Sequence, residues 1–319
     1  MIMSRSNQWN RSAPVATALL CAACTTSVVG CFQSTSGAPA PGVAPVQTIA
    51  NVGFDEPENL VYDAASDVYL VSNIVGGPAA RDDNGFISRV SPDGKMLDLK
   101  WIAGGVNGAV LDAPKGLAIR GDTLAVADVG GVHLFDRRTG APITTHTLPG
   151  LVMNDVAWGA DGTLWITDTG PDRTQTPVDT SKDLDAVWQI MPDGRTRAVA
   201  RGLALDRPDG LLLDDNGALV ATFGANRIEH VNARGERGQQ TVMTLPGGRV
   251  DGLRRLPAGG MVVTSWDAMT VYRVRPGDSL RVLLTDVTSP AGVAVDTKRG
   301  RLAVTSMQNN TLYLLPLPR

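Results

Sequence analysis

The chain has 319 residues, of which 43% are hydrophobic and 19% charged. This apolar content can bury a large core, which excludes a disordered chain and a small scaffold that depends on disulfides. The 29 basic and 32 acidic side chains give a net charge of −3 without runs of like charge, so the sequence offers no electrostatic footprint for nucleic acid. No apolar stretch reaches the roughly 18 residues that a membrane-spanning helix needs.

The N-terminal segment 1–30 is typical of an export signal. Arg5 and Arg11 precede a short apolar stretch, residues 13–23, and the segment 28–31 (VVGC) resembles the cleavage site of bacterial lipoproteins. Cysteine usage agrees, because no cysteine follows Cys31. We therefore predict a lipoprotein signal at 1–30, lipid attachment at Cys31, and a periplasmic or outer-membrane-anchored protein whose only membrane contact is the lipid.

Two alternatives to the lipoprotein remain open at this point. One is a secreted protein cleaved near Ala38 or Ala40, and the other is a cytosolic protein with an unstructured start. The segment 33–45 (QSTSGAPAPGVAP) has the composition of a flexible tether. We therefore predict a linker over 31–45 and a single folded domain, a monomer, over 46–319.

A short unit recurs six times in the domain, and each copy opens with an anchor residue followed by an apolar strand. Successive anchors are 57, 39, 55, 42 and 40 residues apart. A second β-rich strand follows each anchor strand, with Gly-containing turns between them such as 160–162 (ADG), and a third strand comes next. The anchors are Glu58, Lys115, Asn154, Asp209, Asp251 and Ala291.

Repeats of about 40 residues with four short strands are typical of a β-propeller. Six copies predict an all-β, six-bladed β-propeller of four-stranded blades. The last copy ends after its third strand, while 46–52 (VQTIANV) is a strand without a blade. We expect this N-terminal strand to complete the sixth blade and to leave no free sheet edge.

Counting strand reversals places all six anchors around one mouth of the central tunnel. The two long spacings come from insertions at 73–85 and 170–185, both between second and third strands. Both loops are therefore expected over the same mouth, where functional loops commonly lie.

Four of the anchors carry side-chain oxygens that converge on this mouth: Glu58, Asn154, Asp209 and Asp251. Carboxylate and amide oxygens are the ligands that Ca²⁺ prefers, and without a counter-ion the carboxylates would repel one another. The pattern predicts one divalent cation, Ca²⁺ before others. Individually, Asp209 and Asp251 have an alternative interpretation as turn residues, because each precedes Gly.

The repeat and its anchors resemble the regucalcin/gluconolactonase (SMP-30/gluconolactonase/LRE-like) superfamily of six-bladed propellers. The resemblance is carried by Glu58 opening blade one, Asn154-Asp155 opening blade three and Asp251-Gly252 opening blade five. It implies a divalent cation at these positions and an activity among lactonases and phosphotriesterases. Asp209 departs from the family, which has Asn there, and the added negative charge would change how the ion is held.

The resemblance implies a metal-dependent hydrolase of a lactone or related ester, acting on a small molecule at the mouth. The cation would polarise the carbonyl, and water or Asp251 would act on it as nucleophile or proton acceptor. Lys115 and Asn73 are assigned to substrate binding. Lys115 has an alternative role, in which it replaces the metal by pairing directly with the carboxylates.

The rival hypothesis is a non-catalytic binding propeller of the NHL type in the cell envelope, with a structural cation or none. A strictosidine-synthase-like propeller has no distinguishing residue here. The histidines fall on third and fourth strands, away from any metal-ligand spacing. We interpret the tryptophans on strands as inter-blade core, and Trp266 also as core, with a place at the mouth as the alternative.

Overall fold

The computed structural model describes residues 46–170, 185–234, 237–275 and 277–318. Within these ranges the chain forms 22 strands and one short 3₁₀ helix, η1 (Leu203–Leu205). The predicted signal, the linker, Cys31 and most of the second long loop lie outside the described residues. No helix in the described part is long and apolar enough to cross a membrane.

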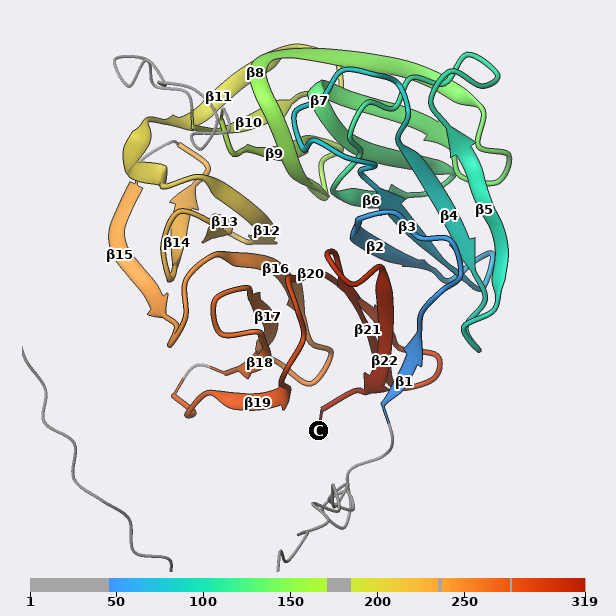
Figure 1. The fold of residues 1–319 in the computed structure, drawn as a ribbon. Helices are drawn as coiled ribbons and strands as arrows, with labels where there is room; N and C mark the ends of the chain where they lie inside the picture. The colour runs from blue at the N-terminus through green and yellow to red at the C-terminus, as the bar shows by residue number, and fades with distance from the viewer. Residues whose placement is uncertain (1–45, 171–184, 235–236, 276, 319) are drawn as a thin grey trace, which may run out of the picture. The chain divides into compact units, whose positions relative to one another are not determined.

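Four-stranded antiparallel sheets form blades one, four, five and six, arranged around a common axis (Figure 1). Blade one contains β2 (Pro57–Asp63), β3 (Val68–Asn73), β4 (Phe86–Val90) and β5 (Met96–Ala103). Blade four contains β12 (Pro208–Asp214), β13 (Gly217–Thr222), β14 (Arg227–Asn232) and β15 (Arg237–Thr244). Blade five contains β16 (Val250–Arg255), β17 (Met261–Ser265), β18 (Thr270–Val274) and β19 (Arg281–Leu284).

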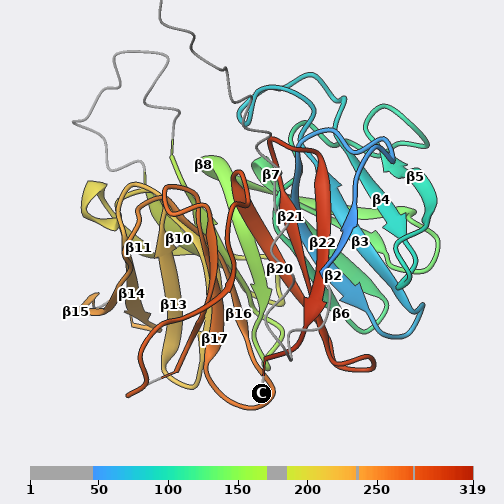
Figure 2. The same ribbon diagram turned by 60° about the horizontal axis from the view of Figure 1, so that its bottom comes forward.

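The ring closes through the N-terminal strand, as predicted. Blade six contains β20 (Pro290–Asp296), β21 (Arg301–Ser306) and β22 (Thr311–Pro316), and β1 (Gln47–Ile49) pairs antiparallel with β22. Ile49 is buried with Leu60 of blade one and Leu312 of blade six. The first and last parts of the domain thus share one sheet. Figure 2 shows the sheets of neighbouring blades standing face to face, and apolar clusters pack between them.

Blades two and three differ from the expected pair of separate four-stranded sheets, because they form one six-stranded sheet. Its strands are β6 (Leu117–Arg120), β7 (Thr123–Asp136), β8 (Pro142–Trp158), β9 (Leu164–Asp168), β10 (Ala186–Ile190) and β11 (Thr196–Arg201). β7 covers the second and third strands expected for blade two, and β8 runs on from blade two into blade three. The anchor spacing here, 39 residues, is the shortest of the five.

The glycine after an anchor lets neighbouring inner strands approach closely. A Cβ on Gly210 of β12 would lie 2.0 Å from the carbonyl oxygen of Asp251, and one on Gly252 of β16 would lie 2.4 Å from that of Ala291. Both glycines lie within strands and neither has a positive φ. The interpretation of Asp209 and Asp251 as turn residues is therefore wrong.

Hydroxyl groups on the second strands join one blade to the next. Thr264 of β17 donates to the carbonyl oxygen of Ala291 in blade six at 2.9 Å, and Thr305 of β21 donates to that of Glu58 in blade one at 2.7 Å. Thr167 of β9 donates likewise to the carbonyl oxygen of Asp209. These bonds fix the backbone of the anchors, and so they fix where the anchor side chains begin.

Candidate metal centre

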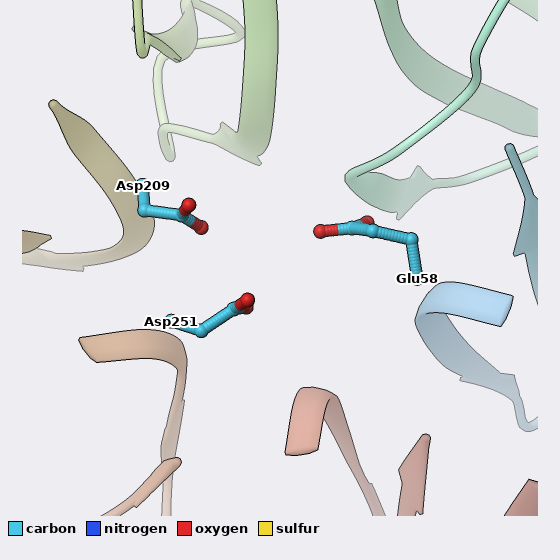
Figure 3. A group of neighbouring side chains, drawn as sticks. All are labelled: Glu58, Asp209 and Asp251. Carbon is cyan, nitrogen blue, oxygen red and sulfur yellow. The ribbon is translucent and has the colours of Figure 1, made fainter. Parts of the chain in front are cut away.

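Three carboxylates from blades one, four and five converge at the mouth of the tunnel. Glu58 at the start of β2, Asp209 of β12 and Asp251 of β16 each offer an oxygen within 4.8 Å of the others. Figure 3 shows the three side chains pointing toward a common point. All three are at most 4% exposed, so water screens their repulsion weakly.

Asn154 of β8 places a fourth side-chain oxygen beside the group. Its amide nitrogen donates to Asp209 Oδ2 at 2.9 Å and to Thr169 Oγ1 at 3.0 Å. Its Oδ1 is buried and has no hydrogen-bond partner among the described residues, and the same holds for Glu58 Oε2. Buried polar atoms are nearly always satisfied, so two orphaned oxygens beside a carboxylate cluster fit a cation-binding site.

Burial and mutual repulsion raise the pKa of all three carboxyls. Loss of solvation is the main cause at Glu58, and the charge of Asp209 adds to it. Loss of solvation is also the main cause of the raised pKa of Asp209, and the charge of Asp251 is the next. For Asp251, loss of solvation again comes first and the charge of Glu58 second. A bound cation would relieve the repulsion between the ionised carboxylates. Without a cation, protons bound to the carboxyls would neutralise the charge instead.

Lys115 lies beside the carboxylates without pairing directly with them. Its ammonium donates to the carbonyl oxygen of Ala113 at 2.7 Å, and among the described residues it forms no ion pair within 4.0 Å. Burial lowers the pKa of Lys115, and the nearby charges of Asp128, Glu58 and Asp209 oppose that shift. The geometry does not support the alternative in which Lys115 replaces the metal.

A second charged layer lies next to the cluster on the inner strands. Arg254 of β16 reaches Asp155 Oδ2 at 3.4 Å and Asn59 Oδ1 at 3.4 Å, and so connects blades five, three and one. Asp155 Oδ2 also accepts the backbone N–H of Leu211 at 2.9 Å. The three carboxylates at −1 each and Lys115 at +1 together carry a net charge of −2, and Asp155 and Arg254 cancel each other, so the second layer leaves this sum unchanged.

A cavity of about 320 Å³ opens above the carboxylates. Its floor is formed by the four oxygen-bearing anchors and Lys115, and its wall is largely apolar. The wall residues that follow second strands are Ile74, Thr169, Phe223, Trp266 and Met307. Trp266 packs edge-on against Phe223 with ring centroids 5.1 Å apart, and its Nε1 donates to Asp251 Oδ2 at 2.9 Å.

This position corrects our interpretation of Trp266 as inter-blade core. Arg207 and Arg249 also line the cavity, each two residues before a carboxylate anchor, and both were missed. Both arginines lie at the same offset, two residues before an anchor, but the repeat alone does not show which neighbours of the anchors face the cavity.

Asn73, which we predicted to bind substrate, is not among the cavity-lining residues. It is fully buried, donates to Val71 O and Ser88 Oγ at 3.1 Å, and accepts the N–H of Asp55 at 3.1 Å. The equivalent Ser265 and Ser306 likewise bind the loop that leads into the first strand of their blades. Asn73 therefore holds a loop in place, and its amide does not line the cavity.

The first long loop does reach the mouth, because Pro78 and Ala79 line the cavity. The second loop lies outside the described residues except at its ends, where Gly170 contributes to the wall. The three histidines do not line the cavity. His133 instead lies 3.4 Å from Asp128 and 2.9 Å from Thr145 Oγ1 in blade two.

The fold and the site together define a six-bladed propeller with an acidic cluster at its tunnel mouth. No protein-family model and no curated protein sequence matches the chain. Similarity to solved structures is clear nonetheless. A protein whose gluconolactonase assignment is inferred superposes with a TM-score of 0.65 and 20% identity, covering 87% of this chain and 93% of its own.

A gluconolactonase from Xanthomonas campestris gives a TM-score of 0.64 at 21% identity, over 86% of this chain and 89% of that one. The virginiamycin B lyase of Staphylococcus aureus gives 0.58 at 15% identity, over 86% and 99%. The chain thus shares the propeller fold of gluconolactonases and of streptogramin-type lyases, and these neighbours are enzymes.

Proposed function

We propose that the protein is a divalent-metal-dependent hydrolase of lactones or related esters. The observation that carries the proposal is a pair of buried oxygens, on Glu58 and Asn154, that have no partner in the described part of the chain and lie beside Asp209 and Asp251. All four ligands are oxygen atoms, which favours a hard cation. Ca²⁺ accepts carboxylate and amide oxygens in a flexible geometry, so it is the ion that we propose for this cluster.

Glu58, Asn154, Asp209 and Asp251 would hold the ion, which supplies Lewis acidity toward the substrate carbonyl. Trp266 donates to one oxygen of Asp251, and the carboxylate of Asp251 would take a proton from the attacking water as well as contact the ion. The water oxygen bonds to the carbonyl carbon, the bond from that carbon to the ester oxygen breaks, and Asp251 returns the proton to the departing oxygen. Lys115 lies where its charge can stabilise the negative oxygen that develops.

The test measures hydrolysis of gluconolactone and of 4-nitrophenyl acetate by metal-stripped protein with and without added Ca²⁺. We expect turnover only with the ion, and a loss of at least a hundredfold in kcat/KM for Asp251→Asn, because the proton acceptor is removed. Asp193→Asn, an exposed carboxylate remote from the cavity, is the control and should match the wild type.

Turnover that is indifferent to chelation, or that survives in Asp251→Asn, would contradict the proposed mechanism. Absence of turnover in protein that binds Ca²⁺ would favour the non-catalytic binding propeller. Export and lipid attachment at Cys31 remain predictions from the sequence.

A further inference from the structure

The guanidinium of Arg207, at the mouth of the cavity, has no hydrogen-bond or ion-pair partner among the described residues. It lies two residues before Asp209 with a φ of 57°, and its guanidinium stacks over the ring of Phe223 at 4.9 Å. Its Nε is buried and unsatisfied, and in the described part of the chain no ion pair or hydrogen bond engages the guanidinium. The stacking holds the group in place while its N–H edge stays available.

Arg249 provides an internal comparison at the equivalent position of blade five. It has a φ of 48° and stacks over Trp266 at 5.4 Å, so it repeats the arrangement of Arg207. Its guanidinium is nevertheless paired with Asp267, whose Oδ1 lies 2.6 Å from Nε. The two positions are built alike, but only Arg207 keeps its charge for another partner.

The charge balance of the cavity points to what that partner is. The lining carries three carboxylates, Glu58, Asp209 and Asp251, against three cations, Lys115, Arg207 and Arg249. A bound divalent ion would leave the lining with two excess positive charges, of which Asp267 offsets one through Arg249. A negatively charged ligand group would complete the balance, and a guanidinium binds a carboxylate with two parallel hydrogen bonds.

We propose that the substrates carry a carboxylate in addition to the ester bond that is cleaved, and that Arg207 binds this carboxylate. The apolar faces of Phe223 and Trp266 add a second requirement, an apolar or aromatic body between the carboxylate and the ester. This inference rests on the proposed function, because it takes the divalent ion as bound. In this inference Arg207 selects the substrate, and the carboxylate cluster with its ion cleaves the ester bond.

A structural role for Arg207 makes a different prediction. The charge of Arg207 opposes the rise in the pKa of Asp209, so the residue could serve only as a counter-charge to the cluster. In that case its removal would change cation affinity and would affect all substrates alike. A role in substrate selection would instead change the preference between a charged and a neutral ligand of the same size.

The experiment uses the full chain loaded with Ca²⁺ and two probes of similar shape, benzoate and benzyl alcohol. Binding is measured by calorimetry for the wild type, Arg207→Gln and Arg207→Lys, with Arg195→Gln as an exposed control. The kcat/KM ratio of 4-acetoxybenzoate to phenyl acetate is measured on the same proteins. Ca²⁺ is titrated into each variant separately, and thermal unfolding confirms that each is folded.

We expect the wild type and Arg195→Gln to prefer benzoate to benzyl alcohol by at least tenfold. Arg207→Gln should abolish this preference and lower the ratio of kcat/KM at least tenfold, with Arg207→Lys intermediate. A preference that survives in Arg207→Gln, or an equal loss for both probes, would overturn the inference. Failure to bind Ca²⁺ in the separate titration would instead overturn the proposed function, whatever the probes show.

Discussion

Asp209 is a buried carboxylate that has two further carboxylates near it, which is unusual for a buried residue. It is 3% exposed, its backbone carbonyl is held by Thr167, and one carboxylate oxygen accepts from Asn154. Two further carboxylates lie near it, and Lys115 forms no direct ion pair with the group. Such a site is unfavourable for the fold and is retained where an ion or a reaction needs it.

The raised pKa values of the three carboxyls give a pH dependence with a definite sign. A group whose pKa is higher in the folded than in the unfolded protein contributes stability at low pH, and loses it as pH rises through the folded pKa. For metal-free protein we expect this loss upward from the ordinary values of 3.8 for Asp and 4.5 for Glu. Ca²⁺ affinity should increase over the same range, because the ion competes with protons.

Urea unfolding of metal-free wild type and Asp209→Asn across this pH range checks the sign. The difference between the two proteins isolates the cluster from other titrating groups, since both variants share those groups. The wild type should lose stability relative to Asp209→Asn as pH rises, and Ca²⁺ should reverse the trend. A difference that is constant with pH would refute our account of the cluster.

The inner strands are the elements that hold the cluster together, and close backbone approach is what they require. Gly210 of β12 faces the carbonyl of Asp251 in β16, with space for a hydrogen and none for a methyl group. Gly210 thus couples the packing of blades four and five to the position of Asp251, a proposed metal ligand. Sequence alone places a glycine here, but only the pairing of two inner strands shows why.

Gly210→Ala should therefore destabilise the fold by about 1–3 kcal/mol, the usual cost of overpacking a filled site. It should also weaken Ca²⁺ binding, because the strand that carries Asp251 must move. Gly77→Ala is the matched control, since its Cβ would meet its nearest neighbour at an ordinary 3.5 Å. Chemical unfolding and Ca²⁺ titration of both variants measure the two effects, and equal behaviour of the two would contradict this role for Gly210.

At the scale of the whole molecule, the propeller depends on closing its ring between the chain's two ends. β1 supplies the outer strand of blade six through its pairing with β22. Arg299 of blade six adds a second link, with Nη2 at 2.7 Å from Asp67 of blade one and Nη1 at 3.2 Å from the hydroxyl of Tyr62. Six blades held in a ring keep the anchors from separate blades in fixed relation to one another.

Ile49→Ala tests the closure, because Ile49 packs its side chain between blades six and one. We expect a loss of about 2 kcal/mol or more, the typical cost of truncating a buried isoleucine. Thr48→Ala, on the exposed face of the same strand, should change stability little. Urea unfolding distinguishes the two, and a stable Ile49→Ala would mean that closure contributes little to folding.

The repeat made the fold and the four oxygen-bearing anchors predictable, because each blade places the same position at the mouth. Arg207 and Phe223 were not predicted, since they lie just outside the anchor positions and the repeat does not show which neighbours face the cavity. Asn73 was assigned to substrate binding, but the sequence does not show that its amide is engaged by Val71, Ser88 and Asp55. The fusion of blades two and three depends on how a short spacing is absorbed, which only the strand pairing reveals.

The central claim, a divalent cation held by Glu58, Asn154, Asp209 and Asp251, is tested most directly by calorimetric titration of Ca²⁺ into metal-stripped protein. We predict saturable binding of one ion per chain, a higher unfolding temperature with the ion, and at least tenfold weaker binding in Asp251→Asn. Absence of both heat and any change in unfolding temperature would contradict the claim, and would leave protons as the counter-charge of the cluster.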